Sequence, residues 1–172
     1  MEVDPLENIR THQISIYDKT SEDMHITEPI YLKDYLLGGF AIITIATGKT
    51  SYTYKVCLDK KYQDFYYTFR RDKHGKWIYL GAYDSTTNEY RDNEYGLLPR
   101  NAWPQTHQLI CYILQHLDDY TALSKYDIYH YCICSRCGRK LTNIDSIKRG
   151  IGLECLERSK NEQLRAANYK NI

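Results

Sequence analysis

The stretch Phe40–Leu58, FAIITIATGKTSYTYKVCL, predicts two antiparallel β-strands joined by a tight turn. Residues 40–47 are an apolar, β-branched run, and residues 51–58 alternate between aromatic or apolar and polar side chains. The connection at 47–50 contains a glycine, which suits a hairpin. This stretch therefore decides the fold class in favour of an antiparallel sheet.

A second strand pair and one helix follow. Residues 64–71 and 76–83 are rich in aromatic side chains, and Asp72–Gly75 supplies the turn because glycine tolerates a positive φ. Residues 100–117 place apolar side chains on one stripe at helical spacing. The stripe consists of Leu109, Ile110, Ile113, Leu114 and Leu117. The predicted fold class is therefore α+β, an antiparallel β-meander packed by one amphipathic helix.

The carboxylate, histidine and cysteine side chains within this part of the chain do not form a recognisable metal site. Residues 84–96 hold carboxylates without the spacing or the glycine of a calcium loop, so we expect an exposed loop. His107 and Cys111 lie four residues apart on the predicted helix, with no third metal ligand nearby in sequence. We expect these two residues, and Cys57, to be structural.

The chain divides into three predicted parts: an N-terminal arm at 1–35, the sheet and helix at 36–128, and a metal-binding module with a terminal helix at 129–172. Residues 130–172 hold nine Lys/Arg and four Asp/Glu, a net charge of +5. No apolar run approaches the ~20 residues that span a membrane, and the acidic start is unlike a secretory signal. We therefore expect a cytoplasmic protein without membrane association. The composition leaves its oligomeric state open.

The segment HYCICSRCGRKL at 130–141 holds three cysteines and a histidine. A chain without a secretion signal does not favour disulfides, whereas Cys134 and Cys137 can turn both thiolates toward one metal ion. Cys155 lies in the first turn of a helix predicted at 153–169, where free N–H groups favour a thiolate. These elements predict a zinc-ribbon or treble-clef-like module with a structural Zn²⁺.

The fourth zinc ligand is left open between two residues. A second Cys-x-x-Cys would end at position 158, which is arginine, so the helix supplies one ligand. His130 lies four residues before Cys134 and has the longer side chain, whereas Cys132 lies two residues before it. A redox-active pair and an iron–sulfur cluster that uses Cys132 are the other interpretations. We favour zinc because no βαβ unit precedes the motif.

Residues 130–155 resemble the zinc-binding module of an uncharacterised family common in bacteriophage genomes, with the pattern H-x3-C-x2-C-G-R-x-L-T, then S-I, then G-x-G-x-E-C. The matching residues are His130, Cys134, Cys137, Gly138, Arg139, Leu141, Thr142, Ser146, Ile147, Gly150, Gly152, Glu154 and Cys155. The family's β-rich region is similar to two segments of this chain, TGKTSYTY and WIYLGAY, so the resemblance extends over about 40–155. The sequence departs at Leu153, where the family has proline, and in adding Cys132. The resemblance implies zinc, His130 as the fourth ligand and a phage or mobile-element origin, but no activity.

The sequence holds no recognisable catalytic constellation, because phosphate loops, G-x-S-x-G, H-E-x-x-H and the deaminase signature are all missing. We expect a non-enzymatic protein that binds a host protein or nucleoprotein complex, as an anti-CRISPR-like inhibitor of host defence would. The alternative is a DNA- or RNA-binding accessory protein that uses the basic module. The predicted contact residues are Arg136, Arg139, Lys140, Lys148 and Arg149.

Overall fold

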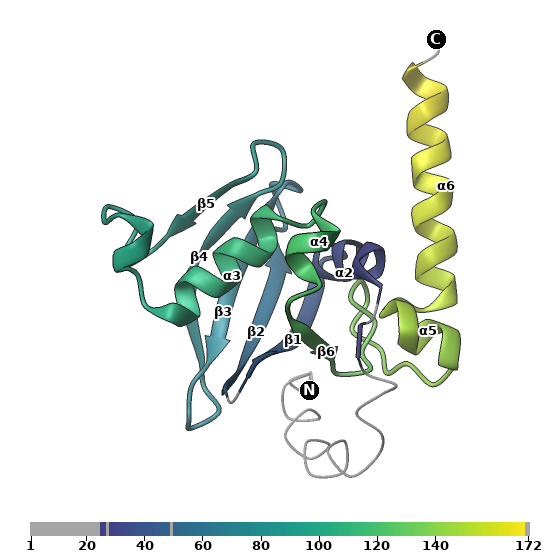
Figure 1. Ribbon diagram of the computed structural model, residues 1–172. Coiled ribbons are helices and arrows are strands. Elements are labelled where there is room, and N and C mark those ends of the chain that lie inside the picture. The colour runs from purple at the N-terminus through teal and green to yellow at the C-terminus, as the bar shows by residue number, and fades with distance from the viewer. Residues whose placement is uncertain (1–24, 27, 49, 171–172) are drawn as a thin grey trace, which may run out of the picture.

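The computed structural model of the chain describes residues 25, 26, 28–48 and 50–170, and its centre is one antiparallel sheet (Figure 1). The strands of the described chain are β1 (Phe40–Thr47), β2 (Thr50–Leu58), β3 (Phe65–Arg71), β4 (Trp77–Asp84), β5 (Glu89–Asp92) and β6 (Asp127–His130), in the spatial order β5-β4-β3-β2-β1-β6. The helices are α2 (Pro29–Leu36), a 3₁₀ turn at Arg100–Ala102, α3 (Gln105–Gln115), α4 (Tyr120–Leu123), α5 (Ile144–Arg149) and α6 (Leu153–Lys170). Residues 1–24 of the expected N-terminal arm lie outside the described residues.

The predicted α+β fold is confirmed. Strands β1 to β4 form the expected meander, in which each strand pairs antiparallel with the next. Alternation of side chains gives the sheet two different faces. In β3, the even-numbered Tyr66 and Thr68 are buried on the side of the helices, whereas Phe65 and Tyr67 are less buried on the other side.

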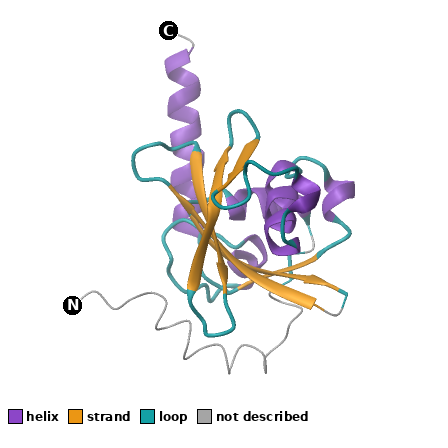
Figure 2. Cartoon of the chain, turned by 90° about the vertical axis from the view of Figure 1, so that its left-hand side faces the viewer, coloured by secondary structure: helices purple, strands orange, loops and turns teal. Residues whose placement is uncertain are grey.

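Helix α3 covers one face of the sheet, as its apolar stripe predicts (Figure 2). Ile110, Ile113 and Leu114 on this helix are fully buried. The helix begins at Gln105, later than the predicted residue 100, because Pro104 adopts an extended conformation just before it. Pro104 also accepts hydrogen bonds from the backbone N–H groups of residues 107 and 108 through its carbonyl oxygen.

The prediction of an exposed loop at 84–96 is wrong for residues 89–92. These residues form the edge strand β5, which pairs with β4 in the register Tyr83↔Tyr90. Asp92 at the end of β5 is buried, and its Oδ2 lies 2.6 Å from Nδ1 of His107 on α3. The expected structural role of His107 thus takes the form of a buried hydrogen bond to Asp92 that joins the edge strand to the helix.

Strand β6 extends the sheet beyond the meander and leads directly into the cysteine segment. It pairs antiparallel with β1, from Ile43↔His130 to Ala46↔Asp127. Helix α2 packs beside β1 with Leu32, Tyr35 and Leu36 buried in the main core, so the boundary expected at 35/36 falls inside this helix.

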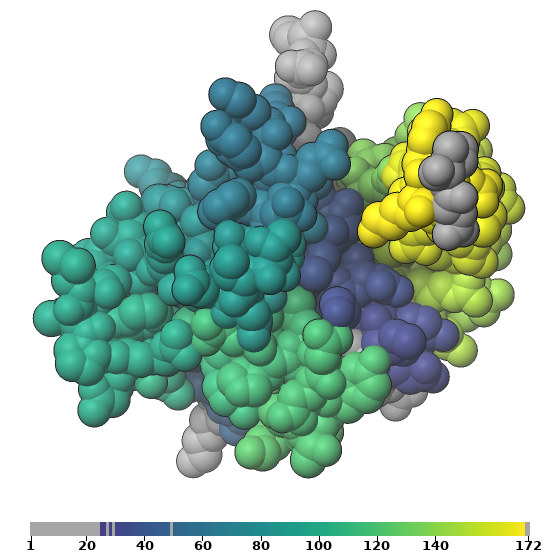
Figure 3. All heavy atoms as spheres, turned by 90° about the horizontal axis from the view of Figure 1, so that it is seen from above, coloured from purple at the N-terminus to yellow at the C-terminus, as the bar shows by residue number. Residues whose placement is uncertain are grey.

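Helix α6 stands away from the rest of the molecule (Figures 1 and 3). Seen from above, α6 is separated from the sheet by the purple segment that contains α2 (Figure 3). Within α6, Cys155 is buried, whereas Leu164 and Tyr169 are 63% and 80% exposed. No helix of the described residues is long and apolar enough to cross a membrane.

Candidate metal centre

A tight hairpin presents the first two cysteines of the module. The N–H of Cys134 donates to the carbonyl of Arg139 at 2.8 Å, and the N–H of Gly138 donates to the carbonyl of Cys134 at 2.9 Å. Gly138 has a φ of 73°, which its missing side chain allows at no steric cost. The chain therefore reverses within a few residues and brings Cys137 back over Cys134.

Helices α5 and α6 bring the third cysteine to this hairpin. Asn143 caps α5 by accepting the N–H groups of Asp145 and Ser146. Gly150 ends α5 in the left-handed conformation, with a φ of 71°. The short link that follows places Cys155 in the first turn of α6, as predicted, and aims the N–H of Gly152 at Sγ of Cys134, 3.4 Å away.

The three sulfur atoms form a compact group that could hold a metal ion. The Sγ atoms of Cys134, Cys137 and Cys155 all lie within 4.8 Å of one another. Cys134 and Cys155 are buried, whereas Cys137 is exposed. A hollow of about 230 Å³ opens beside the three sulfurs, and Ser146, Arg139 and Arg158 are among its lining residues. The donor set of three thiols suits soft or borderline metals such as zinc.

The electrostatics of the group favour a cation. Burial opposes ionisation of Cys134, but the N–H groups of Gly152, Cys137 and Arg136 outweigh it, so the pKa of Cys134 is lowered. Burial, followed by contact with the other two sulfurs, raises the pKa of Cys155 to about 12. Three thiolates held this closely repel one another, and a bound cation would remove that repulsion.

The two candidates for a fourth ligand lie outside this group of close sulfur atoms. His130 is fully buried at the end of β6, where its Nδ1 accepts the N–H of Cys132 at 3.0 Å. Its Nε2 is also buried, and no hydrogen-bond partner among the described residues lies within normal distance and angle of it. Cys132 is half-buried and has a φ of 54°, a strained conformation for a residue other than glycine.

The predicted contact residues do not share one role. The Nη2 atom of Arg136 lies 2.7 Å from each carboxylate oxygen of Glu162, and its Nη1 donates to the carbonyl of Cys155 and to the hydroxyl of Ser159. Arg136 therefore fastens α6 to the cysteine hairpin. Arg139 lies 3.8 Å from Glu154, with both side chains mostly exposed. The other three predicted contact residues surround the hairpin and α5: Lys140 and Lys148 are exposed, and Arg149 is half-buried.

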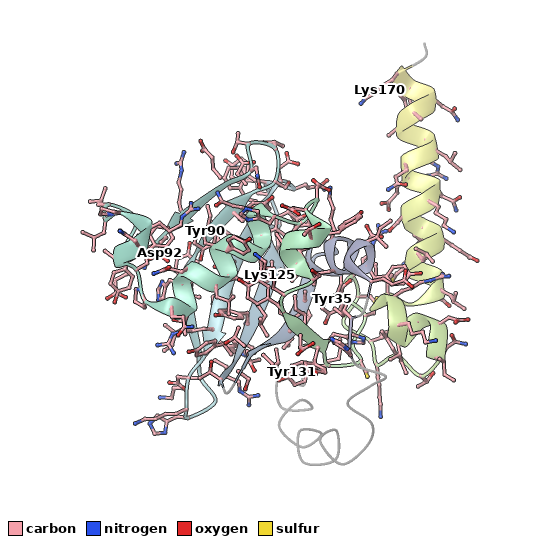
Figure 4. The ribbon with its side chains drawn as sticks, viewed as in Figure 1. Tyr35, Tyr90, Asp92, Lys125, Tyr131 and Lys170 are labelled. Atoms are coloured by element: carbon pink, nitrogen blue, oxygen red, sulfur yellow. The ribbon has the colours of Figure 1, made fainter. Side chains whose placement is uncertain are left out.

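The module packs against the sheet body through Tyr35, which lies beside the module and far from Asp92 (Figure 4). The hydroxyl of Tyr35 donates to the carbonyl of Ile42 at 3.0 Å, and its ring lies 5.3 Å from the ring of His130. A Cβ atom placed on Gly150 would come within 2.2 Å of the Tyr35 ring. Glycine at this position therefore permits both the left-handed turn and the contact between module and body.

Sequence reasoning missed the anchoring roles of Arg136 and Tyr35. The Arg136–Glu162 pair links residues 26 positions apart, and no periodic pattern connects them. The short helix α5 was also not predicted, although the Asn143 cap followed by Asp145 in the first turn is a recognisable helix start.

A family of unknown function (DUF6011) matches residues 127–160, which include β6, the cysteine hairpin, α5 and the start of α6. The chain is thus similar to that family over its metal module. Neither the curated proteins nor the solved structures contain a match to the chain.

Proposed function

We propose that Cys134, Cys137 and Cys155 hold a structural zinc ion that organises the C-terminal module. The observation that carries this proposal is the grouping of the three Sγ atoms within 4.8 Å of one another. The N–H of Gly152 directed at Cys134 supports it, because backbone donors to the sulfur are what a metal-bound thiolate needs. Zinc would supply the cross-link that a small apolar cluster lacks.

The proposed fourth ligand is His130, with Cys132 as the alternative. The buried Nε2 of His130, which has no normal hydrogen bond, supports the histidine. Because His130 lies outside the group of close sulfurs, its binding requires the module to rearrange on metal uptake.

Metal analysis and cobalt spectroscopy of purified variants test both parts of the proposal. We expect one zinc per chain in the wild type and in Cys57→Ser, a matched control whose thiol lies on β2, outside the group of three close sulfurs. Co²⁺ replacing zinc gives absorption bands that count thiolate ligands. If His130 is the fourth ligand, His130→Ala changes these bands and Cys132→Ser does not. Wild-type protein without bound metal would contradict the proposal.

We further propose that the protein is a non-enzymatic binder of a host protein or nucleoprotein complex and acts as an inhibitor of host defence. The resemblance of residues 130–155 to a phage family supports this role. The exposed length of α6, anchored by Cys155 at one end and free of the sheet, offers a surface for such a partner.

An affinity pull-down from host lysate, with and without nuclease, tests this role. We expect a host protein to be recovered by the wild type and lost with Cys155→Ser, because the module no longer holds its shape. Retention that survives nuclease favours a protein contact. Retention that disappears with nuclease, and with charge reversal of Arg139, Lys148 and Arg149, favours the alternative of nucleic-acid binding by the module.

A further inference from the structure

The face of the sheet opposite α3 carries a group of partly exposed aromatic side chains. Helices α3 and α4 lie on the other side of the strands (Figures 1 and 2). Side chains alternate along a strand, so the odd-numbered residues of β3 share the helix-free side. Strand β4 adds two more rings, which pair with β3 in the registers Phe69↔Tyr79 and Arg71↔Trp77. The resulting aromatic face consists of Phe65, Tyr67, Phe69, Trp77 and Tyr79.

Tyr79 lies at the centre of the aromatic face. Its ring centroid is 5.5 Å from that of Phe69 and 6.1 Å from that of Tyr67, with interplanar angles of 57° and 64°. These rings are inclined to one another and are not stacked face to face. Tyr79 and Phe65 are each 39% exposed, which is unusual for large aromatic residues on strands of a packed sheet.

Positive charge adjoins the aromatic face. The Nζ of Lys55 lies 4.6 Å from the ring centroid of Phe69 and 4.9 Å from that of Trp77. Residues 71–76, at the end of β3 and in the following turn, contain three Lys/Arg and one Asp. That carboxylate, of Asp72, accepts the backbone N–H groups of His74 and Lys76, so it is directed into the turn.

We propose that the aromatic face binds single-stranded nucleic acid, with a base stacked on Tyr79 and phosphates beside Lys55 and Arg71. Proteins bind single strands through exposed aromatic rings next to cations, because unpaired bases can stack on the rings while the phosphates lie beside the cations. In a duplex, the π-faces of the bases are covered by the neighbouring base pairs and cannot stack on a protein side chain. An apolar protein surface would have to bury the Lys55 ammonium without a counter-charge, which is unfavourable. The three close cysteines lie outside this face, although Trp77 packs beside Tyr131 of the cysteine segment. Nucleic-acid binding here does not use the cysteines, so it goes beyond the function proposed above.

Fluorescence anisotropy with the full chain tests this inference, using a labelled oligothymidylate and a duplex of the same length. We expect the wild type to bind the single strand in preference to the duplex. Tyr79→Ala should weaken single-strand binding about fivefold or more, the loss of one stacked base. Lys55→Gln should make the slope of log K against log salt less steep by about 0.7, the loss of one phosphate contact on a single strand.

Two exposed residues outside the aromatic face serve as matched controls. Tyr120→Ala on α4 and Lys125→Gln, labelled in Figure 4, remove a ring and a charge from elsewhere and should leave the affinity unchanged. Circular dichroism and zinc content of every variant should equal those of the wild type. Equal affinity for single strand and duplex, an unaffected Tyr79→Ala variant, or an equal loss in the Tyr120→Ala control would overturn the proposal. Self-association of the wild type that Tyr79→Ala abolishes would instead assign the face to a second copy.

Discussion

The sheet body and the C-terminal module are stabilised in different ways. The body buries a cluster of 22 hydrophobic residues between the sheet, α2, α3 and α4, whereas the module buries Cys134, Leu141, Ile151 and Cys155 in a cluster of its own. An apolar cluster of that size cannot offset the conformational entropy of about 40 residues. The body can therefore rely on packing, whereas the module depends on its contact with the body and, as we propose, on a metal ion held by the three cysteines.

Removal of one proposed metal ligand should have the largest effect, and it should destabilise the module but not the body. We expect Cys155→Ser to abolish stoichiometric zinc binding and to unfold the module, because a structural zinc ion contributes on the order of 10 kcal/mol to such folds. Limited proteolysis should then cut within residues 131–170 and spare the body. The control Cys57→Ser should resist cleavage at the same sites. Simultaneous unfolding of body and module in Cys155→Ser would show that they are not separately stabilised.

Loss of the buried hydrogen bond between Asp92 and His107 should destabilise the body and leave the module intact. Asp92→Ala leaves His107 and the backbone N–H groups of Glu94 and Tyr95 without their buried partner. We expect the free energy of unfolding to fall by about 3 kcal/mol, measured by urea denaturation, with zinc content unchanged. Glu89→Ala, on the exposed side of the same strand, is the control and should change it by less than about 0.5 kcal/mol. A loss of zinc in Asp92→Ala would contradict the separation of the two regions.

The contact between body and module gives a smaller effect. Gly150→Ala combines a left-handed backbone, which costs about 1 kcal/mol for a residue with a side chain, with a clash against Tyr35. Gly48→Ala is the matched control, because Gly48 has a φ of 60° and open space around its Cα. We expect Gly150→Ala to destabilise the protein by about 2 kcal/mol more than Gly48→Ala in thermal unfolding. Equal effects would show that the contact with Tyr35 contributes little.

The smallest expected effect concerns the attachment of α6. Arg136→Gln removes the pairing with Glu162, whose carboxylate is mostly exposed, so we expect about 1 kcal/mol of local destabilisation. Amide hydrogen exchange in residues 157–165 should become faster, while exchange in β1 to β4 stays the same. Arg165→Gln, an exposed arginine on the same helix, should leave both unchanged. Faster exchange throughout the chain would mean that Arg136 supports more than α6.

Much of the fold follows from local patterns. The alternation in 51–58 and the apolar run at 40–47 were sufficient to predict the hairpin, because burial of one sheet face imposes a period of two. The strand at 89–92 was not predicted, because β5 is a four-residue edge strand with two buried side chains, the aromatic Tyr90 and the carboxylate Asp92. Burial of Asp92 depends on local N–H groups of Glu94 and Tyr95 and on His107, which lies on a helix that begins 13 residues later.

The meander, the packed helix, the terminal helix and the grouping of the three cysteines could be predicted from the sequence. Each of these depends on spacing along the chain, through strand alternation, helical periodicity or the Cys-x-x-Cys turn. Three features became visible when the segments were placed in space: Arg136 holds α6, Gly150 makes room for Tyr35, and His130 lies outside the sulfur group. These features depend on distances between segments, which are fixed when the module packs against the sheet body.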